Sequence, residues 1–351
     1  MQHLMVCLLA AAASSVAIAP AFAADAAKAP YVAPRAADGH ADLEGFWTNS
    51  NITTLERPVK YGDRGVFTRE ETDQLENTEI NFYKDKAKPV DPTLTAEELL
   101  AMDCGKGFTG AGCGYDAGWI DPGIRVARVR GEPRNSFITS PKNGRMPALT
   151  PAAQARMAEL TAKRRADRSD NPEQRPLGER CITSWANHAG PVMLPTIYNN
   201  NYQIVQSAGA VAIETEVIHD TRMIQMTDKH GPKELRQWYG DSIGHWEGDT
   251  LVIETINYNP NQPFRGSDEN LKVTERLTRV SDRRMLYQFT VADPTAWVSP
   301  WSGEYEFQRG EPIYEYACHE GNYALTNMLA GARAEDEKKA TVASAAPAAK
   351  P

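Results

Sequence analysis

The clearest strand pattern of this chain is Met285-Leu286-Tyr287-Gln288-Phe289-Thr290-Val291. Apolar residues occupy every second position from Met285 to Val291, and the polar residues Gln288 and Thr290 lie between them. Because successive side chains of a strand point to opposite faces, this alternation predicts a β-strand with one buried face.

Short apolar runs of the same kind begin at Asn201 and are separated by turn residues. Ile204-Val205 and Val211-Ala212-Ile213 flank Ser207-Ala208-Gly209, and Trp246 and Leu251-Val252-Ile253 flank Glu247-Gly248-Asp249. Both patterns predict hairpins, and Tyr314 and Tyr316 repeat the alternation before Cys318. Consecutive strands without intervening helices predict an antiparallel meander, which avoids exposed edges by closing into a barrel or doubling into a sandwich. We favour the barrel.

The upstream half combines one strand with helices. Gly45-Phe46-Trp47 predicts a short aromatic strand that joins the barrel. Thr68-x-x-Glu71 and Thr95-x-x-Glu98 are capping-box patterns, and Pro151 suits the first turn of a helix that reaches about Arg168. We therefore expect a mainly β domain over residues 41–333. It comprises a helical and irregular insertion over residues 60–170 and a barrel core over residues 175–333.

The two ends of the chain differ from the predicted domain in composition. Residues 1–23 contain an apolar run and end in Ala21-Phe22-Ala23, which predicts a signal peptide and a periplasmic or secreted protein. The positive charge that usually precedes such a run is missing, so an uncleaved anchor or a different start stays an alternative. Residues 24–40 predict a flexible leader and residues 334–351 a disordered tail.

Composition limits the classes of partner. The net charge of −8 argues against nucleic acid, and no later stretch has the apolar length of a membrane span. No Rossmann glycine fingerprint or P-loop is present, so we expect no nucleotide cofactor.

Four cysteines follow the leader, and an even number in an oxidising compartment predicts two disulfides. Cys104 and Cys113 bracket a glycine-rich loop that can bring its ends together, which leaves Cys181 to pair with Cys318. A zinc site with four thiolates is the alternative, although the sequence contains no C-x-x-C pair.

Several motifs carry a resemblance. Leu55-Glu56-Arg57-Pro58, Trp246 to Val252 (WEGDTLV), Asn270 to Arg276 and Tyr314 to Tyr323 (YEYACHEGNY) resemble a family of secreted bacterial proteins. That resemblance covers most of residues 43–333 and implies export and a single folded unit, without an established activity. Gly45-Phe46-Trp47 also resembles the Gly-x-Trp opening of lipocalin-like barrels, where the tryptophan plugs the closed end, and this implies a ligand-holding barrel.

The first candidate for chemistry is an acid/base site. His319 and Glu320 follow Cys318 at the end of a predicted strand, where a histidine passes protons at neutral pH and a carboxylate orients it. Adjacent strand residues face opposite ways, so His219 and Asp220 from another strand are better partners for His319. The alternative is that both histidines are packing residues near the disulfide.

The second candidate is a nucleophile. Gly240-Asp241-Ser242-Ile243-Gly244 matches the G-x-S-x-G elbow of serine hydrolases, and Asp268 or Asp293 and then His319 follow in the hydrolase order. A strand, rather than the helix that an elbow requires, follows Ser242. We therefore favour a β-turn and keep Ser242 as an alternative nucleophile.

A metal site has little support. Tyr323 stands where H-E-x-x-H needs its second histidine, and the spacing of His219, His245 and His319 matches no metal motif. We expect no metal.

Aromatic and amide side chains are abundant in the second half and predict a pocket for a small organic ligand. They are Trp185, Tyr198, Asn199, Asn200, Asn201, Tyr202, Trp238, Tyr239, Trp246, Trp297 and Trp301. As ligand-binding residues we predict Arg265, Trp246, Tyr202, Asn322 and Tyr323, with Arg265 holding an anion. The alternative is that most of these aromatic residues belong to the barrel core or to a girdle at the strand ends.

The sequence thus predicts an exported barrel that binds a small molecule and needs no cofactor. Cofactor-free acid/base chemistry (a lyase, hydratase or isomerase step), a serine hydrolase, and a non-catalytic envelope binding protein remain alternatives.

Overall fold

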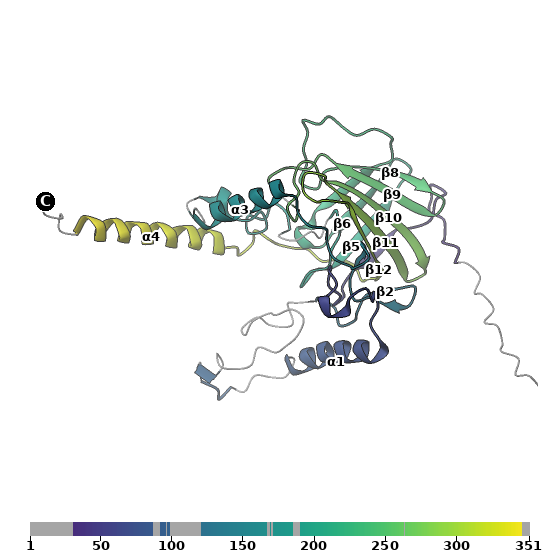
Figure 1. Cartoon of the computed structure of the whole chain (residues 1–351), viewed down its shortest axis with the longest axis horizontal. Coiled ribbons are helices and arrows are strands. Elements are labelled where there is room, and N and C mark those ends of the chain that lie inside the picture. The colour runs from purple at the N-terminus through teal and green to yellow at the C-terminus, as the bar shows by residue number, and fades with distance from the viewer. Residues whose placement is uncertain are drawn as a thin grey trace, which may run out of the picture. The chain divides into compact units, whose positions relative to one another are not determined.

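The computed structural model describes residues 31–86, 92–95, 97–98, 121–166, 169, 171–184, 190–262 and 264–345 (Figure 1). Nine strands form a closed barrel in the order β1 (Gly45–Thr48), β5 (Asn201–Gln206), β6 (Ala210–Thr215), β7 (Thr221–Gln225), β8 (Asp241–Glu247), β9 (Thr250–Ile256), β10 (Lys272–Ser281), β11 (Arg284–Ala292) and β12 (Trp301–Arg309). Pairing of β1 with β12 closes it. The predicted mainly β barrel is confirmed.

Elements outside the barrel come mostly from the insertion and the C-terminus. They are β2 (Arg128–Val129), β3 (Glu132–Pro133), β4 (Ile138–Ser140), α1 (Arg69–Lys86), α3 (Pro151–Ala166), α4 (Ala324–Ala345) and the short 3-10 helices η1 (Val59–Tyr61), η3 (Pro172–Gln174) and η4 (Val217–His219). β4 pairs with β12, so part of the insertion extends the sheet.

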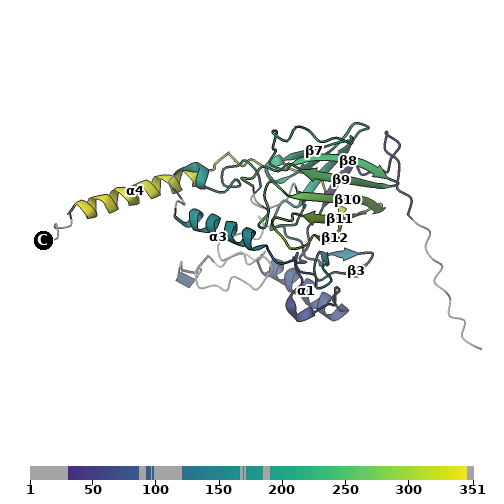
Figure 2. The ribbon, with the colours of Figure 1, turned by 45° about the horizontal axis from the view of Figure 1, so that its top comes forward.

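One strand pair departs from the predicted meander. Nine strands cannot alternate in direction all the way around a closed ring, and the parallel pair is β7 with β8. Figure 2 shows these two strands side by side in the barrel wall. Parallel neighbours need a long return connection, which residues 226–240 provide. This connection brings Trp238 back to the end of the barrel where β8 starts.

The barrel has two unlike ends. At the hairpin end, the tight turns at residues 207–209, 248–249 and 282–283 join β5 to β6, β8 to β9 and β10 to β11. At the loop end, the longer connections 216–220, 257–271 and 293–300 join β6 to β7, β9 to β10 and β11 to β12. Figure 1 shows α3 beside the loop end, from which β8, β10 and β12 start.

The interior of the hairpin end is apolar and closed by Trp47. This side chain is fully buried, and its indole Nε1 donates to Leu43 O at 2.9 Å. The guanidinium groups of Arg309 and Arg279 lie 5.0 and 6.0 Å from its ring centre. The predicted inward residues of β11, Met285, Tyr287, Phe289 and Val291, are buried along the length of the barrel.

The interior of the loop end contains polar side chains. Arg222 and Glu275 are 3% and 0% exposed and form a bidentate ion pair, and Tyr287 Oη donates to Glu275 Oε1 at 2.8 Å. Residues 190–194 cover this layer, since Met193 N donates to Tyr287 Oη at 3.1 Å and Tyr305 Oη donates to Met193 O. These bonds offset much of the cost of burying polar groups, although Arg222 Nε has no hydrogen-bond partner among the described residues.

Residues that we predicted as a flexible leader instead contact the barrel. Within the described part of the leader, Asp38 accepts hydrogen bonds from Gln206 Nε2 at 3.0 Å, and the His40 ring stacks on Trp246 with 4.8 Å between centres. Ala33 is buried. These contacts order residues 33–43 across the hairpin end, although their composition is typical of a linker.

The C-terminal prediction also needs correction. Residues around Tyr314 and Tyr316 form no strand, since β12 ends at Arg309 and Tyr314 is 79% exposed. The predicted disordered tail is helical as far as Ala345, because its alanine, glutamate and lysine residues favour a helix.

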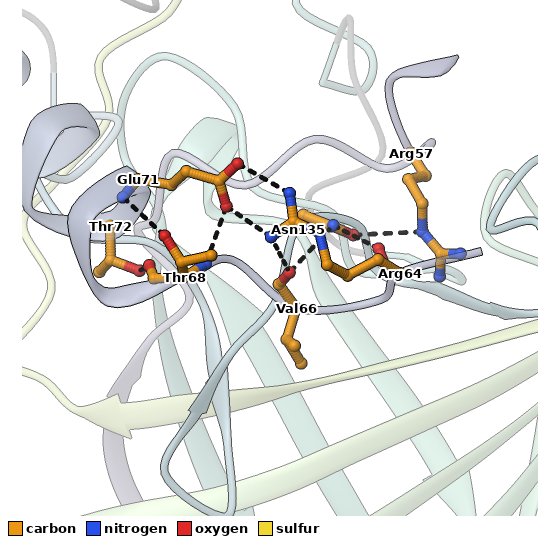
Figure 3. A network of polar contacts seen from close by, with 7 residues as sticks. All are labelled: Arg57, Arg64, Val66, Thr68, Glu71, Thr72 and Asn135. Carbon is orange, nitrogen blue, oxygen red and sulfur yellow. Dashed lines mark hydrogen bonds and ion pairs between the residues drawn. The ribbon is translucent and has the colours of Figure 1, made fainter. Parts of the chain in front are cut away.

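The predicted capping box at α1 is confirmed and belongs to a larger network (Figure 3). Thr68 N donates to Glu71 Oε2 at 2.8 Å, Glu71 N donates to Thr68 Oγ1 at 3.2 Å, and Arg64 forms two hydrogen bonds with the Glu71 carboxylate. The hydrogen bonds from Arg64 lower the pKa of Glu71 to about 2. Asn135 accepts from Arg57 Nε and donates to Arg64 O, which ties this network to the segment before β4. At the second box, Thr95 and Glu98 make the same reciprocal bonds.

Candidate functional site

A cavity of about 930 Å³ lies at the loop end. It is lined by α3, by residues within 171–180, by Trp238 and by residues within 260–268. Its apolar lining residues are Met157, Leu160, Pro176, Leu177, Trp238 and Pro260. Asn171, Gln174 and Asn261 add amides, so the lining has the mixed character of a site for a small organic molecule.

The α3 wall is fixed by the start of its helix. Pro151 is the first helical residue, as predicted, and Thr150 Oγ1 donates to Thr295 O at 2.7 Å. Ala153 is fully buried, and Arg156 Nη2 donates to Gly266 O at 3.2 Å. These contacts anchor α3 to two loop-end connections of the barrel.

The opposite wall is fixed by the disulfide. Cys181 and Cys318 are bonded, as predicted, across 137 residues. Two residues earlier, Glu179 accepts hydrogen bonds from the buried Arg175, and its backbone carbonyl accepts from Asn322 Nδ2. Arg180 therefore sits between two anchored residues. The other predicted disulfide, Cys104–Cys113, lies outside the described residues.

Arg180 is the charged residue of this cavity with the most unusual setting. Its side chain is half-buried and has no hydrogen-bond or ion-pair partner among the described residues. The other arginines of the lining are paired, Arg156 with Asp268 at 3.6 Å and Arg175 with Glu179 at 2.6 Å. An unpaired guanidinium in a cavity is suited to receive an anion.

Trp238 comes from the return connection before β8. Its neighbour Gln237 pairs with Tyr258, and Gln237 O accepts backbone hydrogen bonds from Gly240 and Asn259. The indole ring is half-buried and has no aromatic partner among the described side chains. This leaves its ring available to a ligand in the cavity.

Asp220 and Tyr239 form a second feature of the loop end. Tyr239 Oη donates to the Asp220 carboxylate, and Ser184 N donates to Tyr239 Oη at 3.4 Å. Burial raises the pKa of Asp220, although the bond from Tyr239 acts in the opposite direction. Burial, followed by the Asp220 charge, raises the pKa of Tyr239 well above its usual range.

The four predicted acid/base residues are not gathered into one cluster. His319 and Glu320 are exposed in the turn after Cys318, and no contact among the described residues joins either of them to His219 or Asp220. His219 is exposed at the end of η4, and its charge acts to lower the pKa of the neighbouring Asp220. Only Asp220 of the four has a half-buried environment.

Ser242 does not sit on a nucleophile elbow. It lies inside β8, is 3% exposed, and shares a hydrogen bond of 2.8 Å with Thr255 Oγ1. No histidine of the described part of the chain contacts it. The glycines of the motif serve packing instead, because a Cβ at Gly244 would lie 2.8 Å from Ile224 Cγ2.

The predicted ligand-binding residues lie at separate places. Tyr202 is 1% exposed in the core, where its hydroxyl accepts from Asn49 at 3.2 Å. Arg265 is exposed beside Phe264 and is not part of the cavity lining. Trp246 lines a hollow of about 550 Å³ at the hairpin end.

Asn322 and Tyr323 lie near the disulfide. Asn322 lines a hollow of about 510 Å³ there and donates to Cys181 Sγ at 3.4 Å, whereas Tyr323 is 74% exposed. The predicted set is therefore divided among both ends of the barrel and the core.

Metal ligands do not gather in the part of the chain that the structure describes: no group of three or more histidine, cysteine or acidic side chains has suitable geometry. His245, one of the three histidines considered, is exposed on β8 beside Glu247.

Sequence reasoning missed Arg180 as a functional residue, although it named Trp238 among the aromatic candidates. The only signal for Arg180 was its position next to the predicted Cys181–Cys318 disulfide, which fixes the backbone on one side of it.

Among the described residues, no helix has both the length and the apolar character needed to cross a bilayer. No known family model and no curated protein sequence matches this chain.

Proposed function

We propose that this protein is an exported barrel protein that binds a small organic molecule in the loop-end cavity. The observation that carries the proposal is the cavity itself, whose volume of about 930 Å³ lies within the range typical of ligand pockets. Apolar residues provide contact area, and the amides and Arg180 provide orientation. The polar interior of the barrel is filled by side chains, so the outer cavity offers the space for a ligand.

Export is supported by two observations. The first residues have the composition of a signal peptide, and the Cys181–Cys318 disulfide is of the kind that persists in an oxidising compartment. Membership of the secreted bacterial family that the motifs resemble stays a prediction.

Native mass spectrometry of the protein purified from the periplasm tests the binding function. We expect a retained small molecule, which raises the melting temperature when added back. Leu160→Trp introduces a bulkier side chain into the cavity, where it should obstruct the ligand and abolish both effects, whereas Leu235→Trp, on an exposed part of the 226–240 connection, should preserve them. Equal binding by both variants would contradict the proposed site.

A second candidate is acid/base catalysis by Asp220, which lies at the loop end but is not among the residues that line the cavity. The raised pKa of Asp220, bonded to Tyr239 next to Trp238, favours this function. A carboxyl that keeps its proton to higher pH is a better general acid. Of the predicted residues, His219 is the neighbour that would exchange protons with it.

Metabolite profiling after incubation with periplasmic extract tests catalysis. A compound consumed by the wild type and left intact by Asp220→Asn would support acid/base chemistry. The exposed Asp228→Asn serves as the matched control. Equal consumption by all three proteins would rule out a role of Asp220. Labelling of Ser242 by a fluorophosphonate would instead support the hydrolase alternative.

A further inference from the structure

The loop-end cavity also indicates which class of molecule it takes. We infer that its ligand is an aromatic monocarboxylate, with the carboxylate on Arg180 and the ring against Trp238. This inference rests on the proposed binding function and adds the ligand class.

The charge of the ligand follows from the ion pairs of the cavity. Asp268 is paired with Arg156, and Glu179 neutralises the buried Arg175 of the lining. The remaining acidic lining residues, Glu159 and Glu173, are exposed to solvent. The half-buried Arg180 is thus left with a positive charge that no described side chain balances.

A single balancing charge is expected rather than several. Lys163, the other unpaired cation of the described lining, is exposed on α3, so solvent screens its charge. A polyphosphate or a nucleotide would need more cations than one guanidinium. A carboxylate matches the planar fork of an arginine with two parallel hydrogen bonds.

The backbone around Arg180 is held in place by local hydrogen bonds. Arg180 N donates to Pro176 O at 3.2 Å, Cys181 N donates to Gly178 O at 3.2 Å, and Ile182 N donates to Leu177 O at 3.0 Å. These bonds form a compact turn, which the disulfide joins to residue 318. A backbone fixed in this way reduces the ordering cost when the guanidinium binds an anion.

The aromatic part of the inferred ligand follows from Trp238 and the apolar residues of the cavity lining. Trp238 is the aromatic side chain of the described lining, and Leu160, Leu177 and Pro260 complete the apolar surface. A cavity of about 930 Å³ is far larger than acetate or formate requires, so a carboxylate alone would leave it mostly filled with water. A ring that packs against Trp238 uses this surface.

Isothermal titration calorimetry with three matched probes tests the inference. The probes are 2-naphthoate, its neutral amide 2-naphthamide, and the non-aromatic cyclohexanecarboxylate. We expect 2-naphthoate to bind more tightly than either of the others, and the full-length protein with its disulfide intact is used throughout.

Variants separate the two contacts. Arg180→Gln should weaken 2-naphthoate about 10- to 100-fold, the range for a hydrogen-bonded charge, and should leave 2-naphthamide unchanged. Arg180→Lys should retain part of the affinity because it keeps the charge without the planar fork. Trp238→Leu should weaken both naphthyl probes about 3- to 10-fold. Arg333→Gln, an exposed arginine of α4, makes the same charge change away from the cavity and should have no effect.

Two results would overturn the ligand class. If 2-naphthoate and 2-naphthamide bind equally and both are lost in Leu160→Trp, the cavity binds small molecules but does not select carboxylates. If 2-naphthoate does not bind at millimolar concentration, the inference fails, and a ligand retained in native mass spectrometry would still support the binding function. The two proposals therefore fail separately.

Discussion

The two ends of the barrel solve the problem of closure in different ways. The hairpin end has tight turns and an apolar interior closed by Trp47, with residues 33–43 ordered across it. The loop end has a polar interior, a covering segment at residues 190–194 and an outer cavity of about 930 Å³. The proposed ligand cavity and the Trp47 closure therefore lie at opposite ends of the barrel. Four changes test whether the two ends contribute independently to stability and to binding.

The largest effect is expected at the loop end, from loss of the disulfide. The pair Cys181→Ser and Cys318→Ser frees a loop with a sequence separation of 137 residues. The chain-entropy model gives a loss of about 5 kcal/mol in the free energy of unfolding. Urea titration measures this loss, and the wild type under reducing conditions is the comparison. A loss below about 1 kcal/mol would show that packing alone holds the loop end.

Trp47→Ala tests the hairpin end. Truncation of a fully buried tryptophan should lower the free energy of unfolding by about 4 kcal/mol. If the two ends are independent, the ligand affinity of the folded protein should stay unchanged. Calorimetry at a temperature where the variant is folded measures that affinity, and Trp47→Phe provides a milder control. A loss of affinity together with the loss of stability would show that the two ends of the barrel are coupled.

Glu275→Gln tests the polar interior of the loop end. This change leaves the buried Arg222 without its counter-charge and should lower the free energy of unfolding by about 3 kcal/mol. This is the low end of the range for a broken buried ion pair, because glutamine still accepts hydrogen bonds. Glu269→Gln, on the more exposed pair with Arg236, should cost less than about 1 kcal/mol.

A double variant tests whether the ion pair of Arg222 and Glu275 stabilises the barrel, or whether each residue only prevents the other from being a buried unpaired charge. Glu275→Leu with Arg222→Met removes both charges and should be less damaging than Glu275→Gln. The opposite order in urea titrations would show that the pair is itself a main source of stability.

The smallest effect is a pH dependence at Asp220. Its pKa in the folded protein is raised by burial, so the folded state binds more protons than the unfolded state. The free energy of unfolding should therefore fall as pH rises from about 4, the ordinary value for aspartate, through the raised pKa. Asp220→Asn removes this part of the pH profile, and Asp228→Asn does not. Melting curves at stepped pH measure both, and identical profiles for the two variants would contradict the assignment.

Local rules in the sequence predicted much of the framework. The alternation from Met285 to Val291, the turns at residues 207–209 and 247–249, and the capping box at Thr68 are each encoded within a few residues. These elements form as predicted because their determinants are short-range. The pairing of Cys181 with Cys318 was predicted by elimination, after Cys104 had been assigned to Cys113 across the glycine-rich loop.

The predictions that were wrong concern segments whose structure does not follow from the local features that we used. Residues 33–40 and 334–345 have compositions typical of flexible chain, whereas their order depends on contacts or on helix propensity. The alternation at Tyr314 and Tyr316 predicts a strand, yet no strand pairs with this segment. A strand needs a neighbour, and that requirement is not local.

Short-range patterns in the sequence were sufficient to predict most barrel strands and the helix starts at Thr68 and Pro151, and the cysteine positions predicted the Cys181–Cys318 disulfide. The tertiary structure decided the parallel pair of β7 and β8, the buried pair of Arg222 and Glu275, and the cavity that joins Arg180 to Trp238. Closure of nine strands imposes the first, because an odd ring cannot alternate. The buried ion pair and the cavity form where segments distant in the chain meet at the loop end. No local sequence pattern predicts which of these segments come into contact.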